Sequence, residues 1–293
     1  PRTIQDAIKI THELGFDYLW VDSLCIIQDD AVEIAQEIAL MPLIYSNAVV
    51  TIAASSARAV TDGFLGHDTI FDGPATRLST IEPDGTPGCV FAVLIPDGGD
   101  PLHCRGWALQ EALSSTRLLD YGTRQLRFSC SVVLYNDEGF RDGWTRSATY
   151  FGWDIHPVLD LFSRGTENRI QLWHNMVQKY TDRRLSIPAD RSLGISSIAS
   201  IISSKIPQDE YIAGHWKSNL PEDLLWSVRE QVQRPKTFQG PSWSWTGVNG
   251  PIGLNYALPR FAPRRAKVIS TTNVLVEQSA PFSAVKAATL VLR

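Results

Sequence analysis

The sequence predicts an α/β fold with a mostly parallel sheet at the amino end, followed by a smaller α+β region. Helical periodicity over 4–14 stops at Gly15, and the apolar run 16–21 follows as a buried strand. Asp29 and Asp30 then open a second helix, and 49–53 reads as another strand. The order helix, strand, helix, strand is typical of parallel strands joined by right-handed crossovers.

Local patterns predict the remaining elements. Thr3 is a hydroxyl cap for the first helix, Pro42 kinks or ends the second, and Asp190 caps a later one. An inserted β-hairpin is expected at 77–81 and 89–94. The other expected helices are 107–113, 167–180, 191–204 and a short one after Pro221, and the other expected strands are 117–121, 125–130, 243–248, 266–269, 274–277 and 289–292.

This order of elements predicts two domains, at 1–135 and 166–293, joined by a polar, Gly-containing linker at 136–165. The alternative is one continuous domain, in which the Trp-rich tail closes back onto the sheet. A chain of 293 residues is long enough for either arrangement.

Composition excludes several classes of function. A net charge of −4 with scattered Lys and Arg gives no argument for nucleic acid, and no Gly-rich phosphate loop occurs. No run reaches the roughly 20 apolar residues of a membrane span, and no signal peptide opens the chain. The four cysteines form no CxxC or CxxH pair, which argues against a metal site and fits reduced thiols in the cytoplasm.

A polar cluster follows the first predicted strand, where ligands bind in open α/β sheets. Its members are Asp22, Ser23, Cys25, Gln28 and Asp29. A Cys25 nucleophile would need a base, and the nearest candidate in sequence is His12 on the preceding helix. The alternative is structural, with Asp22 and Gln28 bonded to loop backbone.

A second polar cluster contains Arg105, Trp107, Gln110 and Glu111. Arg105 suits planar bidentate pairing, either with the carboxylate of Glu111 or Asp22 or with a phosphate group. The segment 241–245 carries two Trp at alternate positions, which in a strand lie on one face, and packing is the preferred role for them over ligand stacking.

Four blocks in order resemble the fungal heterokaryon incompatibility (HET) domain family. They are Asp17–Asp30, Met41–Tyr45 with Asn47 and Ala48, Arg105–Glu111, and Pro241–Trp245. The family pattern has a further strand block before the first helix, so we expect the sequence to be truncated at its amino end. The chain departs from the pattern at Ile34, where Trp is frequent, and at Ala112, where Arg is frequent.

The resemblance implies a cytoplasmic protein of fungal non-self recognition that triggers regulated cell death. One reading is an interaction module that self-associates or binds a protein partner, with no cofactor. The other follows from the likeness of HET domains to TIR domains, which share a flavodoxin-like sheet. It implies an enzyme that cleaves NAD as its substrate, with Glu37 as key carboxylate and with Asp22 and Arg105 in the same cleft.

Overall fold

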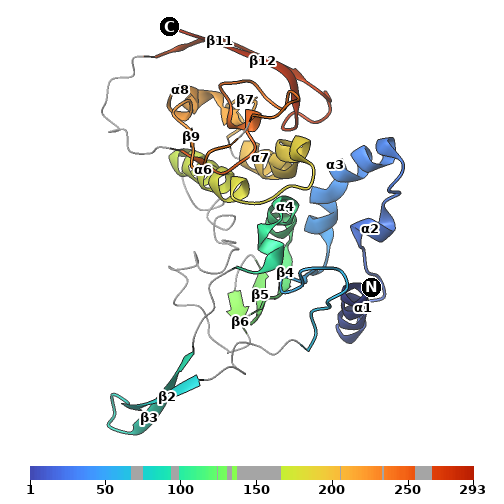
Figure 1. The fold of residues 1–293 in the computed structure, drawn as a ribbon, viewed down its shortest axis with the longest axis vertical. Helices are drawn as coiled ribbons and strands as arrows, with labels where there is room; N and C mark the ends of the chain where they lie inside the picture. The colour runs from blue at the N-terminus through green and yellow to red at the C-terminus, as the bar shows by residue number, and fades with distance from the viewer. Residues whose placement is uncertain are drawn as a thin grey trace. The chain divides into compact units, whose positions relative to one another are not determined.

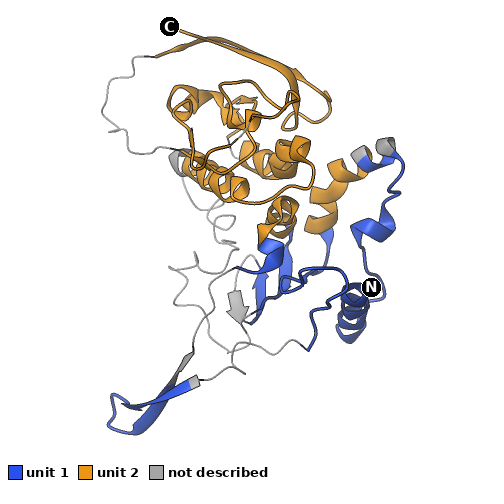
Figure 2. Ribbon diagram, viewed as in Figure 1, with its two compact units in different colours: residues 1–34, 47–103, 115–154 blue, residues 35–46, 104–114, 155–293 orange. Residues whose placement is uncertain are grey.

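The computed structural model describes residues 1–66, 75–93, 99–123, 125–130, 134–136, 166–204, 206–232, 234–254 and 266–293. The chain divides into two compact units that interleave along the sequence (Figure 2). The first comprises residues 1–34, 47–103 and 115–154, and the second comprises 35–46, 104–114 and 155–293. Residues 137–165, which contain nearly all of the predicted linker, lie outside the described residues. The predicted boundaries at 135 and 166 therefore stay a prediction.

Helix α1 (Arg2–Glu13) opens the first unit and ends as its sequence predicts. Gly15 has a φ of +77°, in the left-handed region where glycine is preferred after a helix. Thr3 is not the predicted cap, because the helix already begins at Arg2 and the Thr3 hydroxyl donates to the carbonyl of Ala59 at 3.3 Å. The Asp6 carboxylate accepts from the amides of Phe64 and Leu65, which fixes α1 to the loop after β1 (Thr51–Ala53).

The predicted strand at Phe16–Val21 is wrong. This segment has no regular structure, and the Tyr18 side chain is 92% exposed. A strand exists only where a neighbouring strand takes up its backbone hydrogen bonds, and no described strand pairs with these residues. The segment leads into a single helical turn, α2 (Asp22–Cys25), and then into α3 (Ala31–Asn47). Helix α3 begins as predicted, with the Asp30 carboxylate accepting from the Glu33 amide at 3.1 Å, and it continues through Pro42.

The sheet of the first unit has four short strands, in the order β1, β4 (Arg117–Tyr121), β5 (Leu126–Cys130) and β6 (Leu134–Asn136). Only β1 and β4 pair in parallel, and the β4–β5 and β5–β6 pairs are antiparallel. Burial alternates along β4 and β5, as in antiparallel sheets with one face covered. The chain is thus a mixed α/β protein with small sheets, and the mostly parallel, flavodoxin-like sheet is not confirmed.

Several local predictions in the first 130 residues are confirmed. The inserted hairpin consists of β2 (Ala75–Ile81) and β3 (Pro87–Val93), which pair antiparallel. The short helix is α4 (Gly106–Ser114), preceded by a 3₁₀ turn, η2 (Pro101–Cys104). Strands β4 and β5 lie within a residue of their predicted limits. The two hairpins have a strong local signal, namely turn residues between apolar segments.

The second unit contains α4 together with the helical and β elements of the carboxyl half (Figure 1). Its helices are α6 (Thr166–Thr181), α7 (Ser196–Ser203) and the short α8 (Leu220–Asp223), with 3₁₀ turns at η4 (Pro188–Arg191), η5 (Leu193–Ile195), η6 (Lys217–Asn219) and η7 (Trp245–Gly247). Its strands form three two-stranded ladders: β7 (Tyr211–Ile212) with β8 (His215–Trp216), β9 (Ser227–Val228) with β10 (Ile252–Gly253), and β11 (Val268–Leu275) with β12 (Val285–Leu292).

Three predictions for this half are wrong in detail. Residues 191–204 are not one helix, because Asp190 lies inside η4 and its carboxylate accepts from the Trp107 indole instead of capping α7. Residues 243–248 are not a strand, because the Ser244 hydroxyl caps η7 by accepting from the Thr246 amide. The two short strands at 266–269 and 274–277 are one strand, β11, whose pairing with β12 shifts register at two places.

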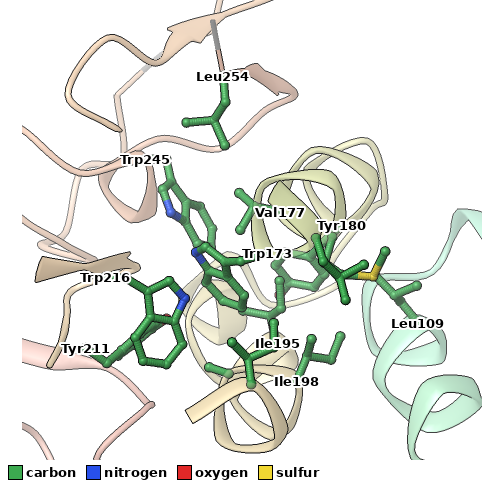
Figure 3. Close-up of a cluster of buried hydrophobic side chains, with 14 of the residues drawn as sticks. Leu109, Trp173, Val177, Tyr180, Ile195, Ile198, Tyr211, Trp216, Trp245 and Leu254 are labelled. Atoms are coloured by element: carbon green, nitrogen blue, oxygen red, sulfur yellow. The ribbon is translucent and has the colours of Figure 1, made fainter. Parts of the chain in front are cut away.

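The aromatic side chains of the second unit build its core, as Figure 3 shows. Trp173 on α6 makes edge contacts with Trp216, at a centroid distance of 6.0 Å, and with Tyr211, at 5.7 Å. The indoles of Trp173 and Trp245 both donate to the carbonyl of Gly214, at 3.2 and 2.8 Å. Packing, the preferred role for the 241–245 block, is therefore observed for Trp245, although not on a strand face.

The β7–β8 turn brings that carbonyl to the two indoles. Ala213 and Gly214 have φ values of +44° and +95°, the two positive values that a type I′ hairpin turn requires. A Cβ at Gly214 would lie 2.7 Å from Nε1 of Trp245. The turn thus needs glycine both for its backbone conformation and for the close approach of an indole.

No helix in the described ranges is long and apolar enough to cross a membrane.

We predict that Gly214→Ala destabilises the second unit by about 2–4 kcal/mol, from the strained φ and from the clash with Trp245. Urea unfolding followed by tryptophan fluorescence measures the loss. Gly253→Ala is the matched control in the same unit, since its Cβ would meet no atom closer than 3.6 Å. Equal unfolding midpoints for the two variants would contradict the role given to the Gly214 turn.

Candidate functional site

The polar cluster after Val21 has a local structural role. The Gln28 side chain donates to the carbonyls of Asp22 and Ile26, at 3.2 and 3.0 Å, and the Asp22 carboxylate accepts from the Ser23 amide at 2.6 Å. These are the loop contacts that the sequence offers as its alternative reading. Ser23, Cys25 and Asp29 are exposed on the same stretch, and Cys25 is a free thiol.

The three residues of the predicted cleft do not all lie in one unit. Asp22 belongs to the first unit, whereas Glu37 and Arg105 belong to the second. Glu37 is half-buried on α3, and Arg105 is exposed just before α4. Their convergence therefore stays a prediction.

Two members of the Arg105 cluster attach α4 to other elements of the second unit. The Trp107 indole donates to the Asp190 carboxylate at 3.2 Å. Burial raises the pKa of Asp190, and this hydrogen bond opposes the rise. The buried Gln110 side chain accepts from the Ser197 amide at 3.1 Å, at the start of α7. Glu111, one residue further along α4, is half-buried.

A buried cluster of charged residues in the first unit is the strongest candidate site. Asp120 on β4 and Arg127 on β5 are register partners across the hairpin. The guanidinium Nη2 of Arg127 donates to Asp120 at 2.5 Å and to Asp100 at 2.8 Å. His103 on η2 lies beside both carboxylates, with Nδ1 3.8 Å from Asp100 and Nε2 3.7 Å from Asp120. All four side chains are less than a tenth exposed.

Burial and charge act against each other in this cluster. Burial raises the pKa of Asp100, but the hydrogen bond from the Thr123 amide and the charge of Arg127 outweigh it, so the pKa lies below its usual value. Burial lowers the pKa of His103, although Asp120 and Asp100 oppose the shift. The cluster therefore holds ionised Asp100 beside a neutral imidazole near pH 7.

Asp100, His103 and Asp120 also have the residue types and spacing of a metal site, since one ligand atom from each lies within 4.8 Å of the others. The residues do not fit a divalent ion well, because the Arg127 guanidinium already bridges the two carboxylates as a cation. A metal ion would have to displace that guanidinium and would then lie beside it. We therefore assign Arg127 as the cation of this cluster.

The second unit contains another buried polar cluster, between α6, β8 and α8. The Asp223 carboxylate lies 2.7 Å from Nε2 of His174 and 3.5 Å from Nδ1 of His215. It also accepts a hydrogen bond from Nδ2 of the Asn219 side chain at 2.6 Å. Burial raises the pKa of Asp223, but the two imidazoles outweigh this effect and bring it to about 2. This buried carboxylate, held by three partners, joins α6, β8 and α8.

Sequence reasoning missed both buried clusters, although one signal was present. The predicted strands around Gly122 and Thr123 place Asp120 opposite Arg127, and opposite charges facing each other in a hairpin favour pairing. Asp100 and His103 belong to a different segment and have no such signal. His174 is far in sequence from His215 and Asp223, so only the folded chain reveals the three as a group.

Residues 1–111 match the family model described as "Heterokaryon incompatibility protein (HET)". The family assignment is thus confirmed for this part of the chain, which is less than half of its 293 residues and contains three of the four motif blocks; the block at 241–245 lies outside the match. No curated protein and no solved structure matches the chain.

We predict that Arg127→Met destabilises the first unit by about 3–5 kcal/mol, because it leaves two buried carboxylates without their cation. Hydrogen–deuterium exchange of peptides from β4 and β5 measures the loss in the unit concerned. Arg117→Met is the matched control on β4, where an exposed side chain donates to the Val49 carbonyl at 3.3 Å, and it should cost at most about 1.5 kcal/mol.

Adding Asp100→Asn and Asp120→Asn to Arg127→Met should restore part of the lost protection, since the uncompensated charge is then gone. Similar exchange in Arg127→Met and in the control would contradict a charge-stabilised cluster.

Proposed function

We propose that this chain, a HET protein over residues 1–111, acts in the cytoplasm of a fungus as an interaction module of heterokaryon incompatibility. Self-association or binding of a protein partner brings copies of the domain together, and this assembly triggers regulated cell death. The HET match supports a role in heterokaryon incompatibility, and the assembly step is our own proposal.

The exposed apolar side chains at the start of the first unit are the observation that carries this proposal. Five large apolar side chains within the first 27 residues are between 45% and 92% exposed: Ile8, Leu14, Tyr18, Leu24 and Ile27. Exposed large apolar side chains occur singly on most proteins, but a dense group of them is typical of interaction surfaces. Tyr is also among the residues that contribute most to binding energy at protein interfaces.

The chemistry of this region also favours binding over catalysis. The side chains of Asp22 and Gln28 are engaged with loop backbone, and within the described part of the chain no hydrogen bond joins Cys25 to His12, the base it would need. The buried charged cluster of Asp100, His103, Asp120 and Arg127 is closed by internal pairing, as in a structural ion network.

We predict that Tyr18→Asp combined with Leu24→Asp weakens self-association at least about tenfold, because charge replaces apolar contact area. Sedimentation of the purified chain over a concentration series measures the association. Both positions are exposed, so stability should change by no more than about 0.5 kcal/mol per site. Ile81→Asp is the matched control, because Ile81 is 80% exposed in the same unit but lies on the β2–β3 hairpin.

Expression of the wild-type chain in a filamentous fungus should arrest growth, and the double variant should not. The Ile81→Asp control should behave as the wild type does. If the double variant no longer self-associates but still arrests growth, cell death does not depend on self-association, and the proposal is overturned.

A second candidate function is cleavage of NAD, with Glu37 as the carboxylate that stabilises an oxocarbenium-like charge. One observation favours it: Glu37 is half-buried on α3, and its carboxylate makes no hydrogen bond or ion pair with the described residues. A half-buried carboxylate without such a partner is available for a ligand. This reading also requires a flavodoxin- or TIR-like sheet and a cleft shared with Asp22 and Arg105.

If this second function holds, the purified chain depletes NAD, and Glu37→Ala abolishes the loss while the circular dichroism spectrum stays unchanged. Glu33→Ala is the matched control, since Glu33 is half-buried one turn earlier on the same helix. Chromatographic measurement of NAD and nicotinamide gives the readout. A folded wild type that consumes no NAD, or an equal loss of activity in both variants, would eliminate Glu37 as the catalytic group.

A further inference from the structure

Two arginines from distant parts of the sequence lie side by side in the second unit. Arg105 precedes α4 and Arg184 follows α6, and the two residues form an isolated parallel bridge. The Gly106 amide donates to the Arg184 carbonyl, and the Arg184 amide donates to the Cys104 carbonyl, both at 2.7 Å. Both arginine side chains are exposed.

The backbone beneath this pair is tightly fixed. Gly106 is buried, and a Cβ at this position would lie 2.4 Å from the Leu185 side chain and 3.4 Å from the Arg184 carbonyl oxygen. A larger residue here would displace the Leu185 side chain. The two backbone hydrogen bonds hold the segments of both arginines together, which is an arrangement that favours a preorganised site.

The electrostatics of the pair are unfavourable in the absence of a ligand. Residues directly opposite each other in a β-bridge have Cβ atoms roughly 5 Å apart, and like charges there repel. Within the described part of the chain, neither guanidinium takes part in a hydrogen bond or an ion pair. The acidic residues nearest in sequence to Arg184 are engaged elsewhere, since Asp182 pairs with Arg229 and Asp190 accepts from Trp107.

Arg183 brings further positive charge next to the pair, because its Nη1 donates to the Arg105 carbonyl at 3.4 Å. Burial, and then the charge of Arg183, lower the pKa of Lys179 to about 8, so this amine is still largely protonated at neutral pH. The carboxyl end of α6 stabilises nearby cations through the helix dipole. The helix dipole explains why Lys179 and Arg183 are tolerated at this end of α6. It does not explain the presence of Arg105, which comes from another segment.

We propose that Arg105 and Arg184 form a binding site for the diphosphate group of a small molecule. Each guanidinium presents a planar fork of N–H donors that matches the oxygens of one phosphate group. Two forks on adjacent residues suit two linked phosphate groups, and the multiple charge of a diphosphate relieves the repulsion between them. This inference goes beyond the proposed function and requires neither self-association nor the exposed residues Tyr18 and Leu24.

Isothermal titration calorimetry of the whole chain with inorganic pyrophosphate and with a nucleoside diphosphate tests the site. Wild-type protein should bind with a dissociation constant below about 1 mM at low salt, and added salt should weaken binding. Arg105→Gln and Arg184→Gln should each weaken binding about tenfold or more. Arg293→Gln is the matched control, an exposed arginine of the same unit, and it should bind as the wild type does.

Thermal unfolding without ligand shows whether each variant folds. If Arg105→Gln does not fold, Arg105→Lys replaces it. This variant keeps the positive charge but lacks the planar guanidinium fork, and it should still weaken binding severalfold. Tighter binding of the nucleoside diphosphate identifies a nucleotide as the natural ligand, and equal binding identifies free pyrophosphate; both support the site. Absence of saturable binding by the folded wild type, or an equal loss in the Arg293→Gln control, would overturn it.

Discussion

The carbonyl oxygen of Gly214 accepts hydrogen bonds from two buried indoles, and the core of the second unit depends on this one acceptor. A buried Trp must satisfy its N–H or lose the free energy of a hydrogen bond made in water. Placing two such donors on one backbone oxygen joins α6, the β7–β8 turn and η7 at a single point. The surrounding edge contacts between Trp173, Tyr211 and Trp216 then follow from the positions of the indole rings.

The first unit meets the same physical demand with charges. Arg127 satisfies two buried carboxylates at once, as the Gly214 carbonyl satisfies two indoles. An ion network of this kind contributes less net stability than an apolar core of equal volume, but the loss of one member leaves an uncompensated charge. In each unit one acceptor or one cation thus serves two buried partners, and each unit is sensitive to substitution at that point.

Elements with a strong local signal could be predicted from sequence, and elements defined by distant partners could not. The β2–β3 and β4–β5 hairpins were predictable because turn residues between apolar segments specify them locally, and α4 is a short helix that was also predicted from its own segment. The segment 16–21 has the composition of a strand, but a strand also needs a neighbouring strand to pair with, and its composition does not show whether one is present. The same holds for the site: the loop contacts of Gln28, one of two alternatives read from the sequence, are local, while His103 lies beside Asp120 and Asp223 beside His174, each on a different element.

The two units interleave along the sequence, and this limits where the chain can be cut into fragments. The HET match ends at residue 111, inside α4, whereas the parallel partner of β1 and two members of the buried charged cluster, Asp120 and Arg127, come later. A fragment cloned at the family boundary would carry Asp100 and His103 without their cation and β1 without its ladder. The matched segment is thus shorter than the unit whose sheet and ion network it contributes to, and a truncation at residue 111 would remove contacts that hold this unit together.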